Sequence, residues 1–376
     1  MQLFKTFSFP HKYLYLLVII FLCCFCAQNS NAQELGEPEK NFEHLWKEFD
    51  QRYGIFLPKR IDWNLMYEVY RPKVKKETTD EELFKIMTQM LSHLNDFHVT
   101  LISKDPPRMY RSGKPTEIMW DRFGSLDNFY RFLNERPINK KYTQGDIYER
   151  NTFAYAWIAN DIGYIHLNGF YDMAASTTAI DEIVNYFHSA KNLIIDVRRN
   201  GGGDDKVGKA IAGRFADKKR LYMITKTKNG PKHDDFSKAK KWFVEPSGKI
   251  QYTNPIILLI DLYTMSAAEN FALALRVLPH VTIVGDFTSG VYADTETDTL
   301  PNGWEFRIST ALFVDQNGFC WEGIGVPPDL RIINTKQDIE NERDRVLEFA
   351  IELINSGALK AYEKDRKIWS NELRPN

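Results

Sequence analysis

A serine at the boundary between an apolar strand and a helix is the residue of this chain best suited to chemistry. Residues 255–262 are almost continuously apolar, which is typical of a strand buried on both faces, and a stretch rich in Ala and Leu begins at Ser266. The hydroxyl of a serine at such a turn lies beside free N–H groups at the positive end of a helix. That placement suits the nucleophile of an acyl-transfer hydrolase, although such a serine can also serve only as a helix N-cap.

Backbone donors for a developing oxyanion are also present in the sequence. Three glycines, Gly201 to Gly203, follow a buried strand expected at 192–197, and such a turn can approach a ligand closely and direct N–H groups at an anion. The pattern is not GxGxxG and no Gly-Lys-Ser/Thr follows, so it does not indicate a phosphate loop. Gly201, Gly202 and the N–H of Ala267 are therefore candidates for an oxyanion hole.

A serine nucleophile needs a base, and the chain has eight histidines. His98 lies between an expected helix and the strand-like run VTLIS, flanked by polar residues, although a lone histidine at such a junction is more often structural. His166 alternates with apolar residues inside an expected strand. His233 lies in the Lys-rich segment 226–242 and stays open as an alternative base.

Chemistry alone does not identify the acid that would orient the base. Glu322 is embedded in an otherwise apolar, glycine-rich segment, Trp321 to Gly325, where burial of a carboxylate without a partner would be costly. The alternative is an ion pair of Glu322 with Arg276 or Arg307. Cys320 lies close by in the sequence. A lone cysteine is more often a small buried hydrophobic residue than a nucleophile.

The first 32 residues have the pattern of an export signal. Lys5 and Lys12 precede an apolar run over 13–27 that is short for a membrane span, and Ser30-Asn31-Ala32 predicts cleavage before Gln33. The alternative is an uncleaved N-terminal anchor. The expected location is therefore the periplasm or the cell exterior, with no integral membrane span after cleavage.

Composition limits the remaining possibilities. Three of the four cysteines lie in the signal segment, so one cysteine remains and neither an internal disulfide nor a cysteine metal site is expected. We expect no metal and no cofactor. The formal net charge of −1 gives no indication of a nucleic-acid partner.

The elements expected to position these residues fall into five regions. Helices are expected at 41–53, 63–70 and from Thr79 to about residue 94, where Thr79 to Glu82 resembles a capping box. Strands and helices alternate from about residue 153, which indicates a mostly parallel sheet covered on both faces. Residues 304–310 and 311–314 are expected to be paired strands. The regions are a signal peptide (1–32), an N-terminal helical domain (33–102), a linker or minor subdomain (103–155), a catalytic core (156–335), and a C-terminal helix and tail (336–376).

Several motifs in order resemble one known family. LIIDVRRNGGG, TMSAAE, IVGDFTSG, LPNGWEF and EGIGVPPD, with the helical leader that ends in NDFHVTL, are similar to the S41 serine peptidases, the family of C-terminal processing and tricorn-type proteases. The similarity spans most of residues 40–330. It implies an α/β fold with a ClpP- or crotonase-like spiral sheet and a small N-terminal helical domain.

The resemblance also implies roles for individual residues. The processing branch of the family uses a Ser–Lys dyad, but Val291 stands at the lysine position, whereas the tricorn branch uses Ser, His and Glu. The resemblance therefore implies Ser266 as nucleophile, His98 as base and Glu322 as orienting acid. Phe97 replaces the usual glycine before the histidine, and a turn with φ > 0 at that position would displace His98.

The expected function is that of an exported serine peptidase acting on a peptide or an unfolded protein through an acyl-enzyme. Substrate contacts are expected from the loop 285–303, in particular from Thr288 and Ser289, although ordinary loop solvation explains these polar residues equally well. One alternative is an inactive homologue that binds peptides or a small ligand. The other is an esterase that uses the same triad.

Overall fold

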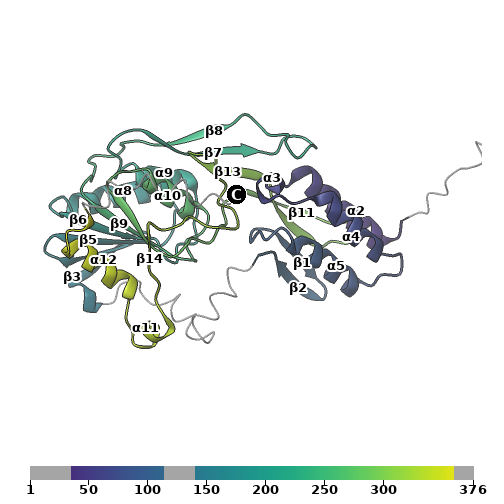
Figure 1. The fold of residues 1–376 in the computed structure, drawn as a ribbon, viewed down its shortest axis with the longest axis horizontal. Helices are drawn as coiled ribbons and strands as arrows, with labels where there is room; N and C mark the ends of the chain where they lie inside the picture. The colour runs from purple at the N-terminus through teal and green to yellow at the C-terminus, as the bar shows by residue number, and fades with distance from the viewer. Residues whose placement is uncertain (1–34, 114–139, 360–376) are drawn as a thin grey trace, which may run out of the picture.

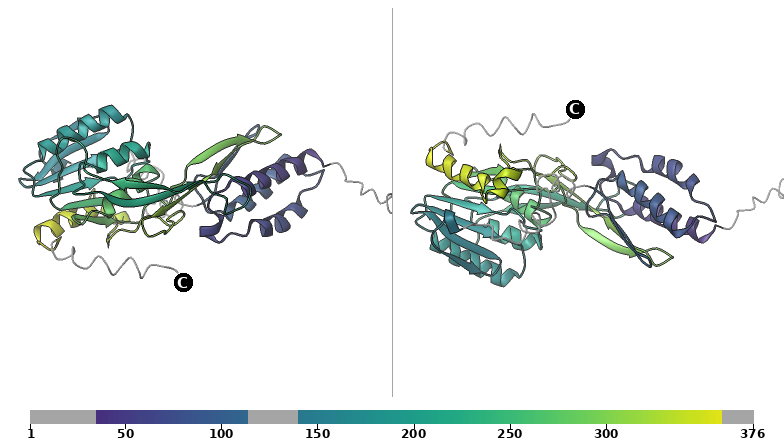
Figure 2. Two further views of the ribbon diagram at one scale, coloured as in Figure 1. Left: turned by 90° about the horizontal axis from the view of Figure 1, so that it is seen from above. Right: turned by 90° about the horizontal axis from the view of Figure 1, so that it is seen from below.

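A group of helices near the N-terminus and an α/β core occupy opposite ends of the long axis of the molecule (Figure 1). The structure is a computed structural model and describes residues 35–113 and 140–359. The predicted signal segment lies outside these residues. Figure 2 shows the same two parts from above and below, with strands crossing between them.

The N-terminal helices bury one apolar face against each other. Phe42, Leu45 and Phe49 recur at helical spacing on the first helix and are fully buried. The predicted capping box starts the last long helix, because Thr79 N–H donates to the Glu82 carboxylate and Glu82 N–H donates to Thr79 Oγ1. The elements are α2 (Glu37–Arg52), α3 (Phe56–Lys59), α4 (Trp63–Tyr70), the 3₁₀ turn η1 (Arg71–Lys73) and α5 (Asp80–Ser92).

A four-stranded antiparallel sheet joins this helical part to a distant region of the chain. The order is β11-β12-β1-β2, and Leu101 of β1 lies opposite Phe306 of β12. Phe306 and Ile308 also belong to the apolar cluster of the N-terminal helices. The start of β1, two residues after His98, is thereby fixed to residues near 306. The strands are β1 (Thr100–Lys104), β2 (Pro107–Arg111), β11 (Thr295–Thr299) and β12 (Glu305–Ser309).

The core is a seven-stranded sheet of order β14-β10-β9-β6-β5-β4-β3. Neighbours from β14 to β5 are parallel, and β4 and β3 are antiparallel. The strands are β3 (Gln144–Arg150), β4 (Phe153–Ala159), β5 (Ile162–Leu167), β6 (Asn192–Asp196), β9 (Ile256–Ile260), β10 (Val281–Gly285) and β14 (Leu330–Arg331), and a 3₁₀ turn η2 (Lys140–Tyr142) precedes β3.

Helices cover both faces of the core sheet, as the continuous apolar strands predict. Alternate residues of β9 point to opposite faces: Ile256 and Leu258 pack with three helices on one face, and Ile257 packs with another helix on the other face. The first three helices are α8 (Met173–Tyr186), α9 (Asp205–Ala212) and α10 (Ala267–Arg276), and the opposite face carries α12 (Arg345–Asn355), preceded by α11 (Lys336–Glu340).

The expected pairing of 304–310 with 311–314 is wrong. β12 belongs to the sheet of β1, whereas β13 (Ala311–Asp315) pairs with β7 (Arg220–Thr227), which also pairs with β8 (Lys240–Val244). Thr310 alone separates β12 from β13, and a hairpin needs at least a two-residue turn. The chain therefore continues from one sheet into the next. This three-stranded sheet extends along the top of the molecule in Figure 1.

Some elements carry no clear pattern in the sequence. β2 and β3 lie within the range expected to be a linker or minor subdomain, and β3 is exposed along almost its whole length, so it shows no apolar alternation. The single C-terminal helix expected within 336–376 is two helices in the described residues, α11 and α12. Asp344 caps the second one and also pairs with buried Arg198 of the core, which fixes the break.

Candidate active site

Ser266 lies at a strained turn between β9 and α10. Its φ of 55° and ψ of −124° are unusual for a residue other than glycine, and they differ from the extended conformation of an ordinary N-cap. The Ser266 N–H lies 3.0 Å from the carbonyl oxygen of Val291 and 3.1 Å from Oε2 of Glu269. A strained serine at a strand-to-helix turn is the arrangement that exposes a nucleophile in α/β hydrolases.

The glycine turn packs directly against this serine. A Cβ at Gly202, which has φ +101°, would lie 2.9 Å from Ser266 Cβ and 3.0 Å from Ala267 N. The Gly202 N–H donates to Asn200 Oδ1 at 2.9 Å, so it is already engaged in this structure. Within the described ranges, the N–H groups of Gly201 and Ala267 donate to no protein acceptor. Of the predicted oxyanion donors, Gly202 and Ala267 therefore lie beside Ser266, and the Gly202 N–H already holds another bond.

His98 is held at the end of the helical part by a tight turn. Its backbone N–H donates to Asp96 Oδ1 at 2.9 Å, and Tyr53 donates its hydroxyl to Asp96 Oδ2 at 2.9 Å. Lys59 Nζ donates to the carbonyl of Asn95 at 2.8 Å. The turn is thus fixed by its own hydrogen bond and by contacts from the end of α2 and from α3.

Phe97 does not have the conformation that would strain the turn. The positive φ, 43°, falls at Asn95, and Phe97 is not among the residues with φ > 0. Asparagine tolerates the left-handed region better than most residues do. The Phe97 ring instead lies under the guanidinium of Arg111, 4.4 Å away. Replacement of the family's usual glycine therefore does not displace His98 through backbone strain.

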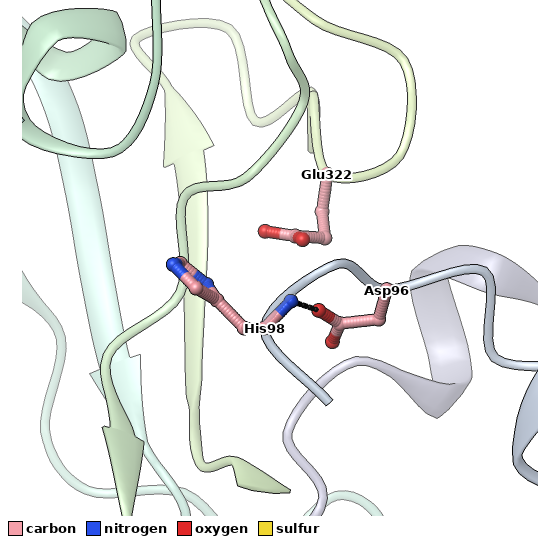
Figure 3. A group of neighbouring side chains, drawn as sticks. All are labelled: Asp96, His98 and Glu322. Atoms are coloured by element: carbon pink, nitrogen blue, oxygen red, sulfur yellow. Dashed lines mark hydrogen bonds between the residues drawn. The ribbon is translucent and has the colours of Figure 1, made fainter. Parts of the chain in front are cut away.

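Glu322 reaches the His98 turn from a different loop. One ring nitrogen of His98 and one carboxylate oxygen each of Asp96 and Glu322 lie within 4.8 Å of one another (Figure 3). Glu322 Oε2 accepts N–H groups from Tyr292 at 2.8 Å and Ala293 at 3.1 Å. Glu322 Oε1 and His98 Nδ1 are buried without a protein partner. Two unsatisfied atoms that suit one hydrogen bond thus lie in the same cluster, although the bond itself is not formed in this structure.

The ion pairs considered as an alternative for Glu322 are not formed. Arg276 donates to the carbonyl of Pro327 and lies 3.8 Å from Asp329, and Arg307 donates to the backbone carbonyl of His98. The Arg307 contact adds another tie between β12 and the His98 turn. The Glu322 carboxyl is therefore left for the cluster with His98.

Burial moves the pKa values of both groups toward their neutral forms. Burial lowers the pKa of His98 to about 4, with Arg307 and Arg111 adding to the shift and Asp96 opposing it. Burial, and then the charge of Asp96, raise the pKa of Glu322 well above its ordinary value, whereas Lys59 and the Tyr292 N–H oppose that rise. A neutral imidazole at neutral pH is the state that a general base requires.

The same three side chains have the donor types of a metal site. One imidazole nitrogen and two carboxylates are ligands that Zn²⁺ accepts. The two Asp96 oxygens already accept hydrogen bonds from Tyr53 and His98, so the set equally fits an acid–histidine pair. Cys320 is partly buried, and burial of its thiol raises the pKa to about 12, which fits the expected inert role.

The other histidines considered as a base have separate surroundings. His233 Nε2 lies 2.8 Å from Asp50 on α2, and its ring contacts Phe56. His166 lies inside β5, where burial lowers its pKa to about 4. Neither belongs to the cluster with Glu322.

The loop 285–303 places one expected substrate contact inside the protein. Thr288 is 1% exposed, donates its hydroxyl to Glu269 Oε1 at 2.6 Å and accepts the Val326 N–H at 2.6 Å. The expectation that Thr288 contacts substrate is therefore not supported. Ser289 is partly buried, with an Oγ that has no protein partner. It stays a candidate contact.

Two further acids, Asp96 and Glu269, belong to the site although the sequence was not interpreted in that way. Glu269 is fully buried beside Ser266, and Ser-Ala-Ala-Glu is a capping-box pattern that could have indicated its contact with the Ser266 N–H. Asp96 lies two residues before His98, the spacing of an Asx turn. Both signals are local and were available in the sequence.

Comparison with known proteins gives a consistent picture. The model of "Peptidase family S41" matches residues 161–332, and that of "Tricorn protease C1 domain" matches residues 36–92. The carboxy-terminal processing protease CtpA of Bacillus subtilis is 28% identical over 46% of this chain and 35% of its own length. The tricorn protease of Thermoplasma acidophilum is 25% identical over 70% of this chain and 21% of its own length.

A solved structure extends the similarity over most of the chain. A candidate peptidase from Parabacteroides merdae is 32% identical, with a TM-score of 0.72, over 85% of this chain and 96% of its own. By contrast, this chain spans well under two thirds of the length of the curated relatives it matches. No helix in the described ranges is long and apolar enough to cross a membrane. The α/β core with N-terminal helices is confirmed, and the chain belongs to peptidase family S41.

Proposed function

We propose that this protein is an exported serine peptidase that cleaves peptide bonds through an acyl-enzyme on Ser266. One observation carries the proposal: consecutive residues of one loop touch the proposed nucleophile and the proposed acid. The carbonyl of Val291 accepts from the Ser266 N–H, and the N–H of Tyr292 donates to Glu322, which lies beside His98. Residues far apart in the sequence thus meet at one place.

In the proposed reaction His98 takes the hydroxyl proton of Ser266 as Oγ attacks the peptide carbonyl. The Ala267 N–H and an N–H of the Gly201–Gly202 turn bind the oxyanion. The C–N bond breaks as His98 returns the proton to the leaving amine. Water then attacks the ester with His98 again as base, which frees Ser266. Glu322 positions the imidazole and stabilises it while it carries the extra proton.

The proposed test compares the wild type with Ser266→Ala. We expect a fluorophosphonate probe to label the wild type alone, and casein hydrolysis to fall by several powers of ten in the variant. Ser356→Ala, at the exposed end of α12, is the matched control and should behave as wild type. Equal casein cleavage by wild type and Ser266→Ala would refute the assignment.

The unformed bond between His98 Nδ1 and Glu322 Oε1 favours a second candidate, an inactive peptide- or ligand-binding homologue. The probe separates the two, since an inert serine does not react. Relative turnover of p-nitrophenyl esters and peptides separates a peptidase from an esterase that uses the same residues. Export is tested by sequencing the N-terminus of the mature protein, where a start at Gln33 is expected.

A further inference from the structure

The segment Gly290–Ala293, named here the strap, bonds two buried carboxylates with four consecutive backbone N–H groups. Its first two N–H groups donate to Glu269, both at 2.7 Å. Its next two donate to Glu322, at 2.8 and 3.1 Å. Since the donors are adjacent along one backbone, a shift of either carboxylate moves the donors of the other.

Glu269 has its full set of hydrogen bonds. In addition to the two strap donors it accepts the Thr288 hydroxyl at 2.6 Å and the Ser266 N–H at 3.1 Å. Two donors meet each oxygen, which matches the roughly four acceptor sites of a carboxylate. The side chain is 0% exposed. Glu269 thus connects the strained Ser266 turn to the strap through fixed bonds.

The strap is also bonded to the loop that carries Glu322. The carbonyl of Gly290 accepts the Gly323 N–H at 2.8 Å. Gly290 has φ +75°, and a Cβ there would lie 2.7 Å from the nitrogen of Ile324. Backbone contact this close leaves little freedom for the two loops to move separately.

Val291 connects the strap to the Ser266 turn by hydrogen bonds. Its N–H donates to Glu269 while its carbonyl accepts the Ser266 N–H at 3.0 Å. The following residue, Tyr292, donates to Glu322. The backbone at these two positions therefore spans the distance between the nucleophile and the acid.

We propose that Glu269 is a positioning residue that holds the Ser266 turn and, through the strap, fixes Glu322 against His98. The proposal rests on the proposed peptidase function for its kinetic consequences, but its structural part stands without it. Glu269 contacts no reacting atom and acts through Ser266 and the strap. Its loss should reduce reactivity without changing how substrate binds.

The first test is hydrogen exchange of the strap amides in wild type, Glu269→Gln and Glu322→Gln. We expect exchange at Gly290 and Val291 to rise by about tenfold or more in Glu269→Gln, because these amides bond different carboxyl oxygens and a Gln side chain keeps only one acceptor oxygen. Coupling predicts faster exchange at Tyr292 and Ala293 as well, although their own acceptor is intact. Faster exchange confined to the first two amides would overturn the coupling.

The reciprocal variant is a second check of the same coupling. Glu322→Gln should also speed exchange at Gly290 and Val291. Unchanged exchange of these two amides in Glu322→Gln, with the altered region limited to Tyr292 and Ala293, would contradict the proposal. Glu182→Gln, an exposed carboxylate on α8, is the matched control and should leave all four amides unchanged.

The second test is kinetic. We expect Glu269→Gln to lower kcat and the maximal rate of fluorophosphonate labelling by about 10²-fold, as for a small misplacement of reacting groups, with KM within about twofold of wild type. A rise in KM with unchanged kcat would identify Glu269 as part of substrate binding instead. If Glu269→Gln does not fold, Thr288→Val serves in its place, because it removes one of the four donors to Glu269. It should also lower kcat with little change in KM, and by a smaller factor.

The two levels of the proposal fail in different ways. If Ser266→Ala cleaves casein as well as wild type, the peptidase function is wrong, while the exchange test still decides the role of Glu269. If Ser266 labels normally in folded Glu269→Gln and the exchange of all four strap amides is unchanged, the positioning role is wrong and the peptidase function stands.

Discussion

Glu269 and Glu322 are two buried carboxyls bonded to the same strap. They differ in whether every carboxyl oxygen has a hydrogen-bond donor. Glu269 accepts four hydrogen bonds, whereas Glu322 accepts two and keeps Oε1 without a partner. Burial raises the pKa of Glu269 to about 7 against the effect of its donors. The Glu322 pKa is raised well above its ordinary value by burial and by Asp96.

The difference in hydrogen bonding predicts a structural role for Glu269 and a reactive role for Glu322. A carboxylate with every lone pair used holds its neighbours in place and has no acceptor site left for a proton-carrying group. An acid with a free oxygen beside a histidine with a free nitrogen can exchange a hydrogen bond as charge moves. We therefore expect that loss of Glu269 mainly lowers stability and that loss of Glu322 mainly lowers activity, which the following variants test.

The largest expected effect is on the activity of Glu322→Gln. The amide oxygen can still accept the strap N–H groups, but it cannot balance the charge of a protonated His98, so kcat/KM should fall by about 10²–10⁴-fold. Because the folded-state pKa of Glu322 lies above its usual 4.5, ionisation of this carboxyl costs stability as pH rises past that value. Thermal unfolding at neutral pH should therefore show equal or higher stability for the variant. A marked loss of stability with retained activity would instead indicate a structural role for Glu322.

Glu269→Ala should affect stability more than any of the other variants. Four buried donors lose their acceptor, which is expected to lower the free energy of unfolding by about 3–5 kcal/mol. Denaturant unfolding measures this, with Glu182→Ala as the exposed control expected within about 0.5 kcal/mol of wild type. Loss of less than about 1 kcal/mol would show that water or other groups satisfy these donors.

The Tyr53→Phe variant tests whether the turn that carries His98 must be held rigid for activity. It removes the 2.9 Å bond to Asp96 Oδ2 and should lower the free energy of unfolding by about 1–3 kcal/mol. The KM should stay near the wild-type value because Tyr53 is fully buried away from substrate, while kcat falls moderately as the His98 turn loosens. An increased KM with full kcat would place Tyr53 at the substrate instead.

The smallest expected effect is a shift in the pH profile of Arg111→Gln. A neutral His98 is required as base, so the acidic limb of kcat/KM should lie near the His98 pKa of about 4 in wild type. The positive charge of Arg111 disfavours the imidazolium, so its removal should move the limb upward by less than about one pH unit. Movement of the limb to lower pH would contradict the electrostatic assignment.

Local sequence patterns predicted the elements that carry the site. The capping box at Thr79, the apolar run before Ser266 and the glycine turn after residue 197 each predicted a structure that is present. These signals depend on hydrogen bonds and side-chain periods within a few residues, so the sequence alone contains them. The family motifs then gave His98 and Glu322, which the structure brings to one cluster.

Sequence patterns did not give the pairing of distant strands. β12 and β13 are neighbours in the chain, yet β12 pairs with β1 and β13 with β7. β3 and β11 are polar and exposed, and an edge strand of this kind carries no alternation to detect. The placement of Thr288 also depended on the fold, because the same polar threonine suits a solvated loop or a buried hydrogen bond to Glu269.

The sequence itself determined three local features. They are Ser266 at a strand-to-helix turn, a glycine turn after a buried strand, and a histidine at a helix-to-strand junction. Only the tertiary structure decided which neighbours surround each of these residues. β1, which follows the His98 turn, pairs with β12, and the strap is bonded both to Glu322 and to the Ser266 N–H. The physical reason is that a buried carboxyl takes its role from which donors surround it, and those donors come from segments that only the folded chain brings together.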